Sequence, residues 1–348
     1  MSFRILVTCA GGGLLPQAIQ YLREHSRHGR VFVVAVDCEA QSMGRHLADV
    51  FEPVPSGTEP GYPARLAEIA ERHAVDLIVP WSDEEALALA RHRGMIERNG
   101  RQLACTDLAT LETLADKAAT YDALERASVP VPKWRRAVNV AELTAAVTEL
   151  LSLDLDVVVK PAVSRGGRNV SVIRSDAREA SSYRGGREVH MNPEIFRRDY
   201  LDRYSALMPV IVTERLYEPT FDLDMLARNG ELVRSVARRR INSAVPNEGH
   251  IIEERADLYQ LAPSIVSTFR LSWLYDCDIM LDRDGHPRIL EINPRPSGSA
   301  AVAVAAGVPL LDDLISVALG ESLPAVTMPY GRIIAPYTAL AAVSDPGR

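Results

Sequence analysis

The chain has 348 residues, 47% of them hydrophobic and 24% charged, and its formal net charge is -7. This length is enough for two or three domains with substantial cores, and the composition is ordinary for a soluble globular protein. The acidic balance argues against general nucleic-acid binding, and no apolar run reaches the roughly 18 residues that span a bilayer. The four cysteines are scattered without metal-site spacing, and the amino terminus shows no signal-peptide pattern, so we expect a cytoplasmic protein.

The first part of the chain, about residues 1–110, alternates between short apolar strands and helical stretches. The predicted strands and helices lie, in order, at residues 5–7, 16–25, 31–36, 64–73 and 76–80. Alternation of this kind is typical of a parallel, doubly wound sheet. We therefore expect an open α/β domain at the amino terminus.

A glycine-rich turn follows the first predicted strand. Gly11, Gly13 and Pro16 approach the dinucleotide-binding pattern, with Asp37 after the second strand as a ribose partner. The third glycine of that pattern is absent, so a nicotinamide enzyme is a distant alternative. A turn that opens a helix can instead hold an anionic substrate group with its free N–H groups.

The third strand of this domain leads into the acidic segment 82–85. Either Ser82 or Asp83 is predicted to cap the next helix, with Glu85 as the capping-box partner. Ligands of open α/β sheets gather at the carboxyl ends of the strands. A substrate contact by Asp83 or Glu84 is therefore a second interpretation of the same residues.

In the middle of the chain, a strand that ends in a lysine is followed by a glycine loop and a further strand. A helix is predicted over residues 111–127, with Asp116 and Lys117 inside it, and a buried strand at 157–161 delivers Lys160. The loop that follows includes Ser164, Gly166 and Gly167 and runs into another strand. A glycine loop between strands can fold over a polyphosphate, and Lys160 adds a positive charge for the phosphates.

The segment 174–208 is polar and helical near its end, which is typical of a mobile lid or substrate loop. Tyr183 and His190 are candidates for substrate contact, although solvent exposure is the favoured interpretation of both. A strand at 210–216 then ends close to Glu214.

The next strand pair, around Asn229 and Gly230, carries three arginines on one face of its second strand. Arg234, Arg238 and Arg240 alternate with other residues, so their side chains project to the same side. Like charges on one face repel each other unless an anion or carboxylates neutralise them. An anion site and a solvated basic face both remain open.

The hairpin at residues 278–299 contains the strongest functional pattern in the chain. Asp284 and Gly285 form a turn dipeptide, and Glu291 and Asn293 project from one face of the return strand. Asp278 lies on the partner strand, thirteen positions before Glu291. Three oxygen ligands can therefore meet at one point, as hard cations such as Mg2+ require. Helices at 300–306 and 310–319 and a late strand at 332–342 complete the chain.

The sequence ILEINPR, with an aspartate thirteen positions before its glutamate, resembles the metal-binding hairpin of the ATP-grasp superfamily. The phrase LADKAATYDAL and the lysine strand with its glycine loop resemble other parts of the same superfamily. The resemblance implies an α/β chain with α+β lobes, the ATP-grasp fold, preceded by an open parallel α/β domain. The implied parts are residues 1–110, a small lobe with linker helices at 111–208, and a large lobe at 209–348.

The resemblance also implies roles for individual residues. Lys117 would reach the nucleotide phosphates, and Glu214 with the backbone that follows it would bind the adenine edge. The position of the usual ribose acid is vacant, and Glu218 or Asp222 flanks it. The expected nucleotide-binding set comprises Lys117, Lys160, Ser164, Gly166, Gly167, Glu214, Arg215, Leu216 and Glu218. The expected metal ligands are Asp278, Glu291 and Asn293, and the expected catalytic arginines are Arg295 with Arg238 or Arg240.

These features together predict an ADP-forming ligase that joins a small carboxylic acid to an amine through an acyl phosphate, with ATP and Mg2+, or Mn2+ in its place. No nucleophile signature is present, and this chemistry needs none. A thiol or bicarbonate acceptor on the same fold, and an ATP-binding module without catalysis, are the alternatives. The expected partners are small-molecule substrates, without nucleic acid or membrane, and a homodimer is the oligomeric state to test.

Overall fold

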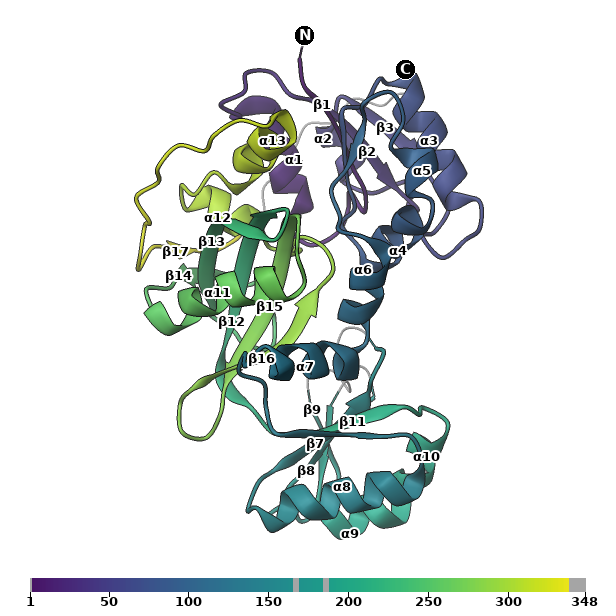
Figure 1. Cartoon of the computed structure of the whole chain (residues 1–348), viewed down its shortest axis with the longest axis vertical. Helices are drawn as coiled ribbons and strands as arrows, with labels where there is room; N and C mark the ends of the chain where they lie inside the picture. Colours follow the sequence, from purple (N-terminus) through teal and green to yellow (C-terminus); the bar gives the residue numbers. More distant parts are fainter. Residues whose placement is uncertain (1, 165–168, 184–187, 338–348) are drawn as a thin grey trace. The chain divides into compact units, whose positions relative to one another are not determined.

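The computed structural model describes residues 2–164, 169–183 and 188–337, and the chain forms two compact units (Figure 1). Unit 1 comprises residues 1–111, 221–277 and 293–348, and unit 2 comprises residues 112–220 and 278–292. Each unit is therefore assembled from separate stretches of sequence. No helix among the described residues has both the length and the apolar character needed to cross a membrane.

The amino-terminal part of unit 1 is the expected open parallel sheet. Its strand order is β3-β2-β1-β4-β5, and every neighbouring pair is parallel. The elements are β1 (Arg4–Val7), α1 (Leu15–Glu24), β2 (Phe32–Asp37), α2 (Gly44–Leu47), β3 (Val50–Pro53), α3 (Tyr62–Arg72), β4 (Leu77–Val79), α4 (Asp83–Arg91), α5 (Arg93–Ile96) and β5 (Gln102–Leu103). The predicted α/β class is confirmed.

The glycine turn after β1 packs against another part of unit 1. Gly13 has a left-handed backbone (φ 49°), and a Cβ atom there would lie 2.7 Å from the carbonyl oxygen of Gly298. Leu14 N–H donates to the same oxygen at 2.9 Å, and Gly11 N–H donates to Asp37 at 2.8 Å. These donors are engaged within the protein. The turn therefore serves close packing, and neither the dinucleotide reading nor the anion reading is supported.

The helix α4 begins with half of the expected capping box. Ser82 is the N-cap, and its side chain accepts from Glu85 N–H. The Glu85 carboxylate accepts from Thr8 Oγ1 at 2.5 Å and also contacts the side chain of Ser82. Burial raises the pKa of Glu85, while the hydrogen bonds from Thr8 and Ser82 act in the opposite direction. Glu85 thus joins the start of α4 to Thr8, the residue that follows β1.

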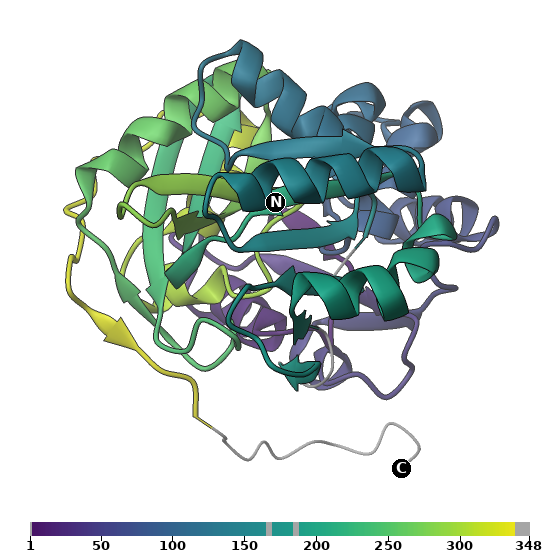
Figure 2. The same cartoon turned by 90° about the horizontal axis from the view of Figure 1, so that it is seen from below.

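The second sheet has the strand order β16-β15-β12-β13-β14-β17, with β17 at its edge (Figure 2). Its elements are β12 (Tyr217–Arg228), β13 (Glu231–Arg240), β14 (His250–Ile252), α11 (Ala256–Thr268), β15 (Trp273–Leu281), β16 (Pro287–Asn293), α12 (Ala301–Ala305), α13 (Leu310–Leu319) and β17 (Ile333–Ile334). The predicted turn at Asn229 and Gly230 is present, with both residues left-handed. The predicted late strand is only two residues long, and residues 338–342 of it lie outside the described part.

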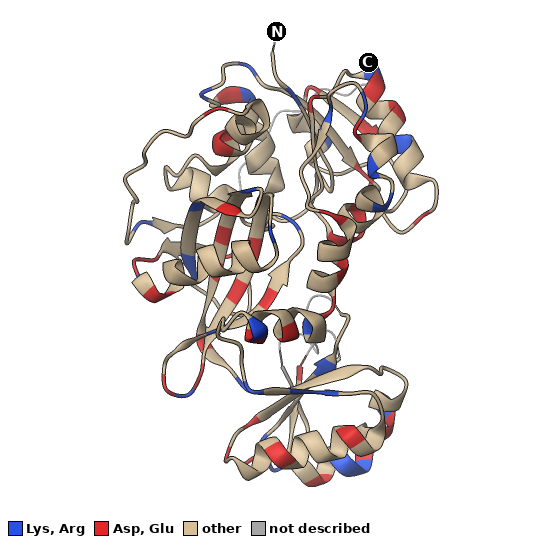
Figure 3. Ribbon diagram, viewed as in Figure 1, with Lys and Arg blue, Asp and Glu red and all other residues tan. Residues whose placement is uncertain are grey.

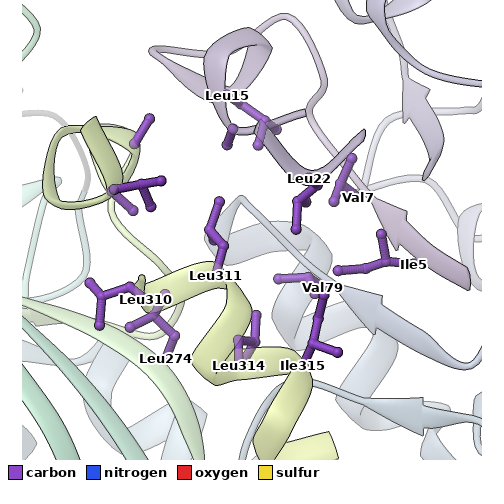
Figure 4. Packing of buried hydrophobic residues seen from close by; sticks show 14 of the residues in the cluster. Ile5, Val7, Leu15, Leu22, Val79, Leu274, Leu310, Leu311, Leu314 and Ile315 are labelled. Atoms are coloured by element: carbon purple, nitrogen blue, oxygen red, sulfur yellow. The ribbon is translucent and has the colours of Figure 1, made fainter. Parts of the chain in front are cut away.

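One hydrophobic core joins the first sheet of unit 1 to its carboxyl-terminal helices. Side chains of β1, α1 and α13 interdigitate, as Leu22, Leu311 and Ile315 illustrate in Figure 4. Polar contacts reinforce the junction, since Tyr21 Oη donates to the buried Asp312 at 2.6 Å. The amino-terminal domain and the helices α12 and α13 therefore share one hydrophobic core.

Unit 2 is built on a sheet of strand order β6-β11-β7-β8-β10-β9. Its elements are α7 (Lys117–Arg126), β6 (Trp134–Ala137), α8 (Val140–Ser152), β7 (Val157–Pro161), β8 (Val170–Ile173), β9 (Ser181–Tyr183), β10 (Glu188–Met191), α9 (Pro193–Ile195), the π-helix η2 (Phe196–Tyr200), α10 (Leu201–Ser205) and β11 (Val210–Glu214). One face of the sheet, including Val157 and Val159, packs in a core with Leu143 of α8. Because side chains alternate along a strand, Lys160 projects from the other face.

Two predictions for unit 2 were wrong. The single helix at 111–127 is two helices, α6 (Leu108–Ala115) and α7, because Asp116 leaves the helical backbone and caps α7 through Ala118 N–H at 2.8 Å. Lys117 therefore begins a helix. His190 is 8% exposed, so its favoured solvent exposure is also wrong. The side chain of Tyr183 lies outside the described residues.

Candidate active site

Two predicted phosphate lysines are anchored in unit 2. Lys117 Nζ donates to the carbonyl oxygen of Ser164 at 2.8 Å and lies 3.4 Å from Glu291 Oε2. Lys117 N–H also donates to Ala162 O, which ties the start of α7 to the loop after β7. The structure thus brings Lys117 to the glycine loop and to a proposed metal ligand at once. Gly166 and Gly167 lie outside the described residues.

Lys160 is buried beside opposite and like charges. Burial lowers the pKa of Lys160 to about 8, and the neighbouring Lys117 contributes to the decrease. Glu291, Glu188 and Asp278 act in the opposite direction. A buried ammonium group that is only partly compensated is suited to an additional anion such as a phosphate.

Glu188 is a charged residue of this group that the sequence analysis missed. It lies on β10, which pairs with β8, and its carboxylate is 3.4 Å from His190 Nε2. Burial lowers the pKa of His190. No local motif marks Glu188, because its proximity to Lys160 depends on the order of strands in the sheet.

The expected adenine segment contains a glutamate that is already engaged. Glu214 is buried at the end of β11, and its carboxylate accepts from Lys133 N–H at 2.8 Å. Arg215 forms an ion pair with Asp156 at 3.6 Å, and Leu216 is buried. Adenine binding by this segment stays a prediction. Because the Glu214 carboxylate is engaged, the backbone after Glu214 would provide most of the contacts with adenine.

The two alternatives for the ribose acid differ sharply in environment. Glu218 is exposed in unit 2. Asp222, in unit 1, is buried and accepts from both Arg240 Nε and Arg240 Nη2, at 2.9 and 2.7 Å, and contacts His250 Nε2 at 3.1 Å. Burial opposes ionisation of Asp222, but His250, Arg238 and Arg240 hold its pKa well below its usual range. Of the two residues, only Glu218 is accessible.

Carboxylates neutralise the arginine face of β13. Figure 3 marks the acidic and basic positions along the ribbon. Arg238 is 0% exposed, donates to both oxygens of Asp224 at 2.6 and 3.0 Å, and donates to Ser299 Oγ at 2.9 Å. Arg234 pairs with the buried Asp313. A solvated basic face is therefore wrong. The catalytic roles of Arg238 and Arg240 stay predictions, and both side chains are held by protein groups in this structure.

Arg295 lies two residues after β16 and contacts the amino-terminal domain. Its Nε atom donates to Asp83 Oδ1 at 3.1 Å, and its Nη2 atom donates to Asn293 Oδ1 at 3.4 Å. Asn293 Nδ2 donates in turn to Asp276 Oδ2 at 3.1 Å. The sequence had pointed to Asp83 as a possible substrate contact, but Asp276 was not among the predicted residues. Asp276 lies two positions before Asp278, and this spacing was an available signal.

The expected metal ligands lie on neighbouring strands. Strand alternation puts Asp278 on the same face of β15 as Asp276, and Glu291 on the same face of β16 as Asn293. Asp278 and Glu291 belong to unit 2, and Asn293 belongs to unit 1. All of these groups offer oxygen, which fits a hard divalent cation. Their convergence on one ion remains a prediction.

Two family models match separate parts of the chain. The model described as "ATP-grasp in the biosynthetic pathway with Ter operon" matches residues 206–338, and "PylC-like, N-terminal domain" matches residues 5–104. A curated protein, the uncharacterized y4rH of Sinorhizobium fredii, is 27% identical over 223 residues. That match covers 62% of this chain and 44% of y4rH, less than half of the relative's length.

Solved structures share the fold at low sequence identity. The biotin carboxylase domain of the Hydrogenobacter thermophilus 2-oxoglutarate carboxylase has a TM-score of 0.69 at 17% identity, covering 95% of this chain and 72% of that one. The N5-carboxyaminoimidazole synthetase of Staphylococcus aureus has a TM-score of 0.67 at 15% identity, covering 93% and 79%. The L-amino acid ligase of Bacillus licheniformis has a TM-score of 0.63 at 14% identity, covering 91% and 74%. Residues 206–338 therefore match an ATP-grasp family model, and the chain shares the ATP-grasp fold with these solved structures.

Proposed function

We propose that the protein is an ATP-dependent, ADP-forming ligase that joins a small carboxylic acid to an amine. The observation that carries the proposal is the contact of Lys117 with Glu291 beside the buried Lys160. This contact brings cations suited to phosphates next to a carboxylate suited to a divalent metal. ATP with a divalent cation is a ligand that requires both kinds of group at one place.

The proposed reaction has two steps. The substrate carboxylate attacks the γ-phosphorus of ATP, which releases ADP and forms an acyl phosphate. The amine then attacks the acyl carbon, phosphate leaves, and an amide remains. Lys117 and Lys160 would hold the phosphates, and Arg295 would stabilise negative charge on the transferred group.

The proposed cation site consists of Asp278, Glu291 and Asn293. A bound Mg2+ would neutralise phosphate charge during the transfer. Glu291 Oε2 lies 3.4 Å from Lys117 Nζ, so a proposed cation ligand and a proposed phosphate lysine are direct neighbours. The same superfamily fold is described with MgADP and bicarbonate for the Hydrogenobacter domain, which makes the acceptor the point to test.

ADP release should be measured with Mg2+ and ATP across a matrix of carboxylic acids and acceptors that includes amines, thiols and bicarbonate. The proposal expects release that requires an acid and an amine together. Release only with a thiol or with bicarbonate would replace the amine acceptor. ATP binding without turnover under any pairing would favour a binding module.

Two variants of the same hairpin, Glu291→Gln and the control Asp284→Asn, test the proposed metal ligands. Glu291→Gln should keep its fold, as judged by circular dichroism and thermal unfolding, and lose about a hundredfold or more of the ADP-release rate. Asp284→Asn is a matched control, because Asp284 is exposed in the turn of the same hairpin. It should retain activity. Normal turnover by a folded Glu291→Gln variant would show that the metal assignment is wrong.

A further inference from the structure

The side chain of Asn293 is held from two sides within unit 1. Its Nδ2 atom donates to Asp276 Oδ2 at 3.1 Å, and its Oδ1 atom accepts from Arg295 Nη2 at 3.4 Å. A carboxylate can only accept hydrogen bonds, and a guanidinium can only donate them. The two neighbours therefore permit one orientation of the amide, with its nitrogen toward Asp276 and its oxygen toward Arg295.

Asp276 is a firm base for this contact. It is 3% exposed and lies in β15, which has β16 on one side and β12 on the other. The buried cation Arg238 is close enough to interact favourably with Asp276. A carboxylate held in the middle of a sheet has little freedom to turn, so it can impose an orientation on the side chain that it binds.

We propose that Asp276 is a positioning residue for the cation site: by binding the amide nitrogen of Asn293, it presents the amide oxygen to the cation. The inference rests on the proposed function, which assigns Asn293 to the metal. Groups that orient a ligand from behind are an ordinary part of metal sites, and their loss typically weakens metal binding by about 10–100-fold.

A different role for Asp276 must be separated from this one. Its carboxylate lies within 4.8 Å of the carboxylate of Asp222. In this second role, the charge of Asp276 itself would attract the cation, either as a direct ligand or together with Asp222. An amide in place of the carboxylate distinguishes the two roles, because an amide still accepts a hydrogen bond from Asn293 but carries no charge.

The test is Mn2+ affinity, measured by electron paramagnetic resonance on the full chain with a non-hydrolysable ATP analogue, so that turnover is not the readout. Asp276→Ala should weaken Mn2+ binding about 10–100-fold. Asp276→Asn should weaken it by much less. Asn293→Ala combined with Asp276→Ala should bind no more weakly than Asn293→Ala alone, because the contact acts through Asn293.

Three results would overturn the inference. Asp276→Ala could bind Mn2+ as the wild type does. Asp276→Asn could lose as much affinity as Asp276→Ala, with the losses multiplying in the double variant, which would show that the charge of Asp276 acts directly. The wild type could bind no Mn2+ beside the nucleotide analogue, which would remove the proposed metal site itself; the first two results leave that site in place.

A control on the same hairpin accounts for loss of stability. Asp282 is buried and accepts from the backbone N–H groups of Asp284 and His286. Asp282→Asn should lower the unfolding temperature and leave Mn2+ affinity unchanged. If Asp276→Ala does not fold, the Mn2+ affinity of Asp276→Asn is the deciding measurement. Retained Mn2+ affinity supports the positioning role. A loss of 10-fold or more, about the lower limit for an orienting group, refutes it.

Discussion

Replacement of Lys160 should have two effects at once. It should stabilise the nucleotide-free protein, and it should abolish the affinity for the phosphates of ATP. The Lys160 side chain is 7% exposed, and burial lowers its pKa from 10.5 to about 8. Each pH unit of difference corresponds to about 1.4 kcal/mol, so the charged lysine costs about 3 kcal/mol at pH 7. Lys160→Met removes that charge with a side chain of similar length.

The pH dependence gives the sign of the effect. Below about pH 8, Lys160 is protonated in both states, and the folded state bears the full penalty. Between pH 8 and 10.5 the unfolded chain binds more protons than the folded one, so the free energy of unfolding of the wild type rises with pH. The advantage of Lys160→Met should therefore fall by about 2–3 kcal/mol between pH 7 and pH 10.

Urea unfolding of the wild type and Lys160→Met at a series of pH values measures this difference, because other titrating groups cancel. Calorimetry with a non-hydrolysable ATP analogue and Mg2+ measures the affinity. Lys133→Met is the control, since the Lys133 side chain is 56% exposed, and it should change stability by less than about 0.5 kcal/mol. A difference between wild type and Lys160→Met that does not vary from pH 7 to pH 10 would refute the reasoning.

Three further predictions concern the scaffold, and urea unfolding measures each of them. Gly13→Ala should destabilise the protein by about 1–3 kcal/mol more than Gly29→Ala, because both positions are left-handed but only the first Cβ meets a backbone oxygen; equal effects would contradict the packing role of the turn. Asp224→Ala should cost about 3–5 kcal/mol because the buried Arg238 loses the carboxylate that accepts two of its hydrogen bonds, and a cost below about 1 kcal/mol would count against that pair. Asp116→Ala should cost about 1 kcal/mol as a lost helix cap, whereas no loss would argue for a continuous helix.

The sequence was informative wherever the signal is local. The turn at Asp284 and Gly285, the strand that carries Lys160, and the common face of Glu291 and Asn293 follow from turn chemistry and from the two-residue period of a strand. The parallel sheet of the first domain follows from its alternating strands and helices. These features require no knowledge of which segments meet in space.

One error occurred where a local signal competed with a local alternative. Asp116 occurs within an apolar pattern that continues past it, and the pattern predicted one helix. The side chain of Asp116 binds two backbone N–H groups of α7, which makes a helix start more favourable at that point. The bond from the Thr8 hydroxyl group to the Glu85 carboxylate, by contrast, joins segments that are distant in sequence, and no local pattern predicts it.

The amino-acid sequence by itself determined the elements and the residue types of the candidate site. Only the tertiary structure decided which charges neutralise each other. Three pairs illustrate this: Asp276 with Asn293, Asp83 with Arg295, and Glu188 with Lys160. The two residues of each pair belong to different segments of the chain, which the folded sheets bring together. The physical reason is that strand order and register, not spacing along the chain, set the distance between side chains on a sheet.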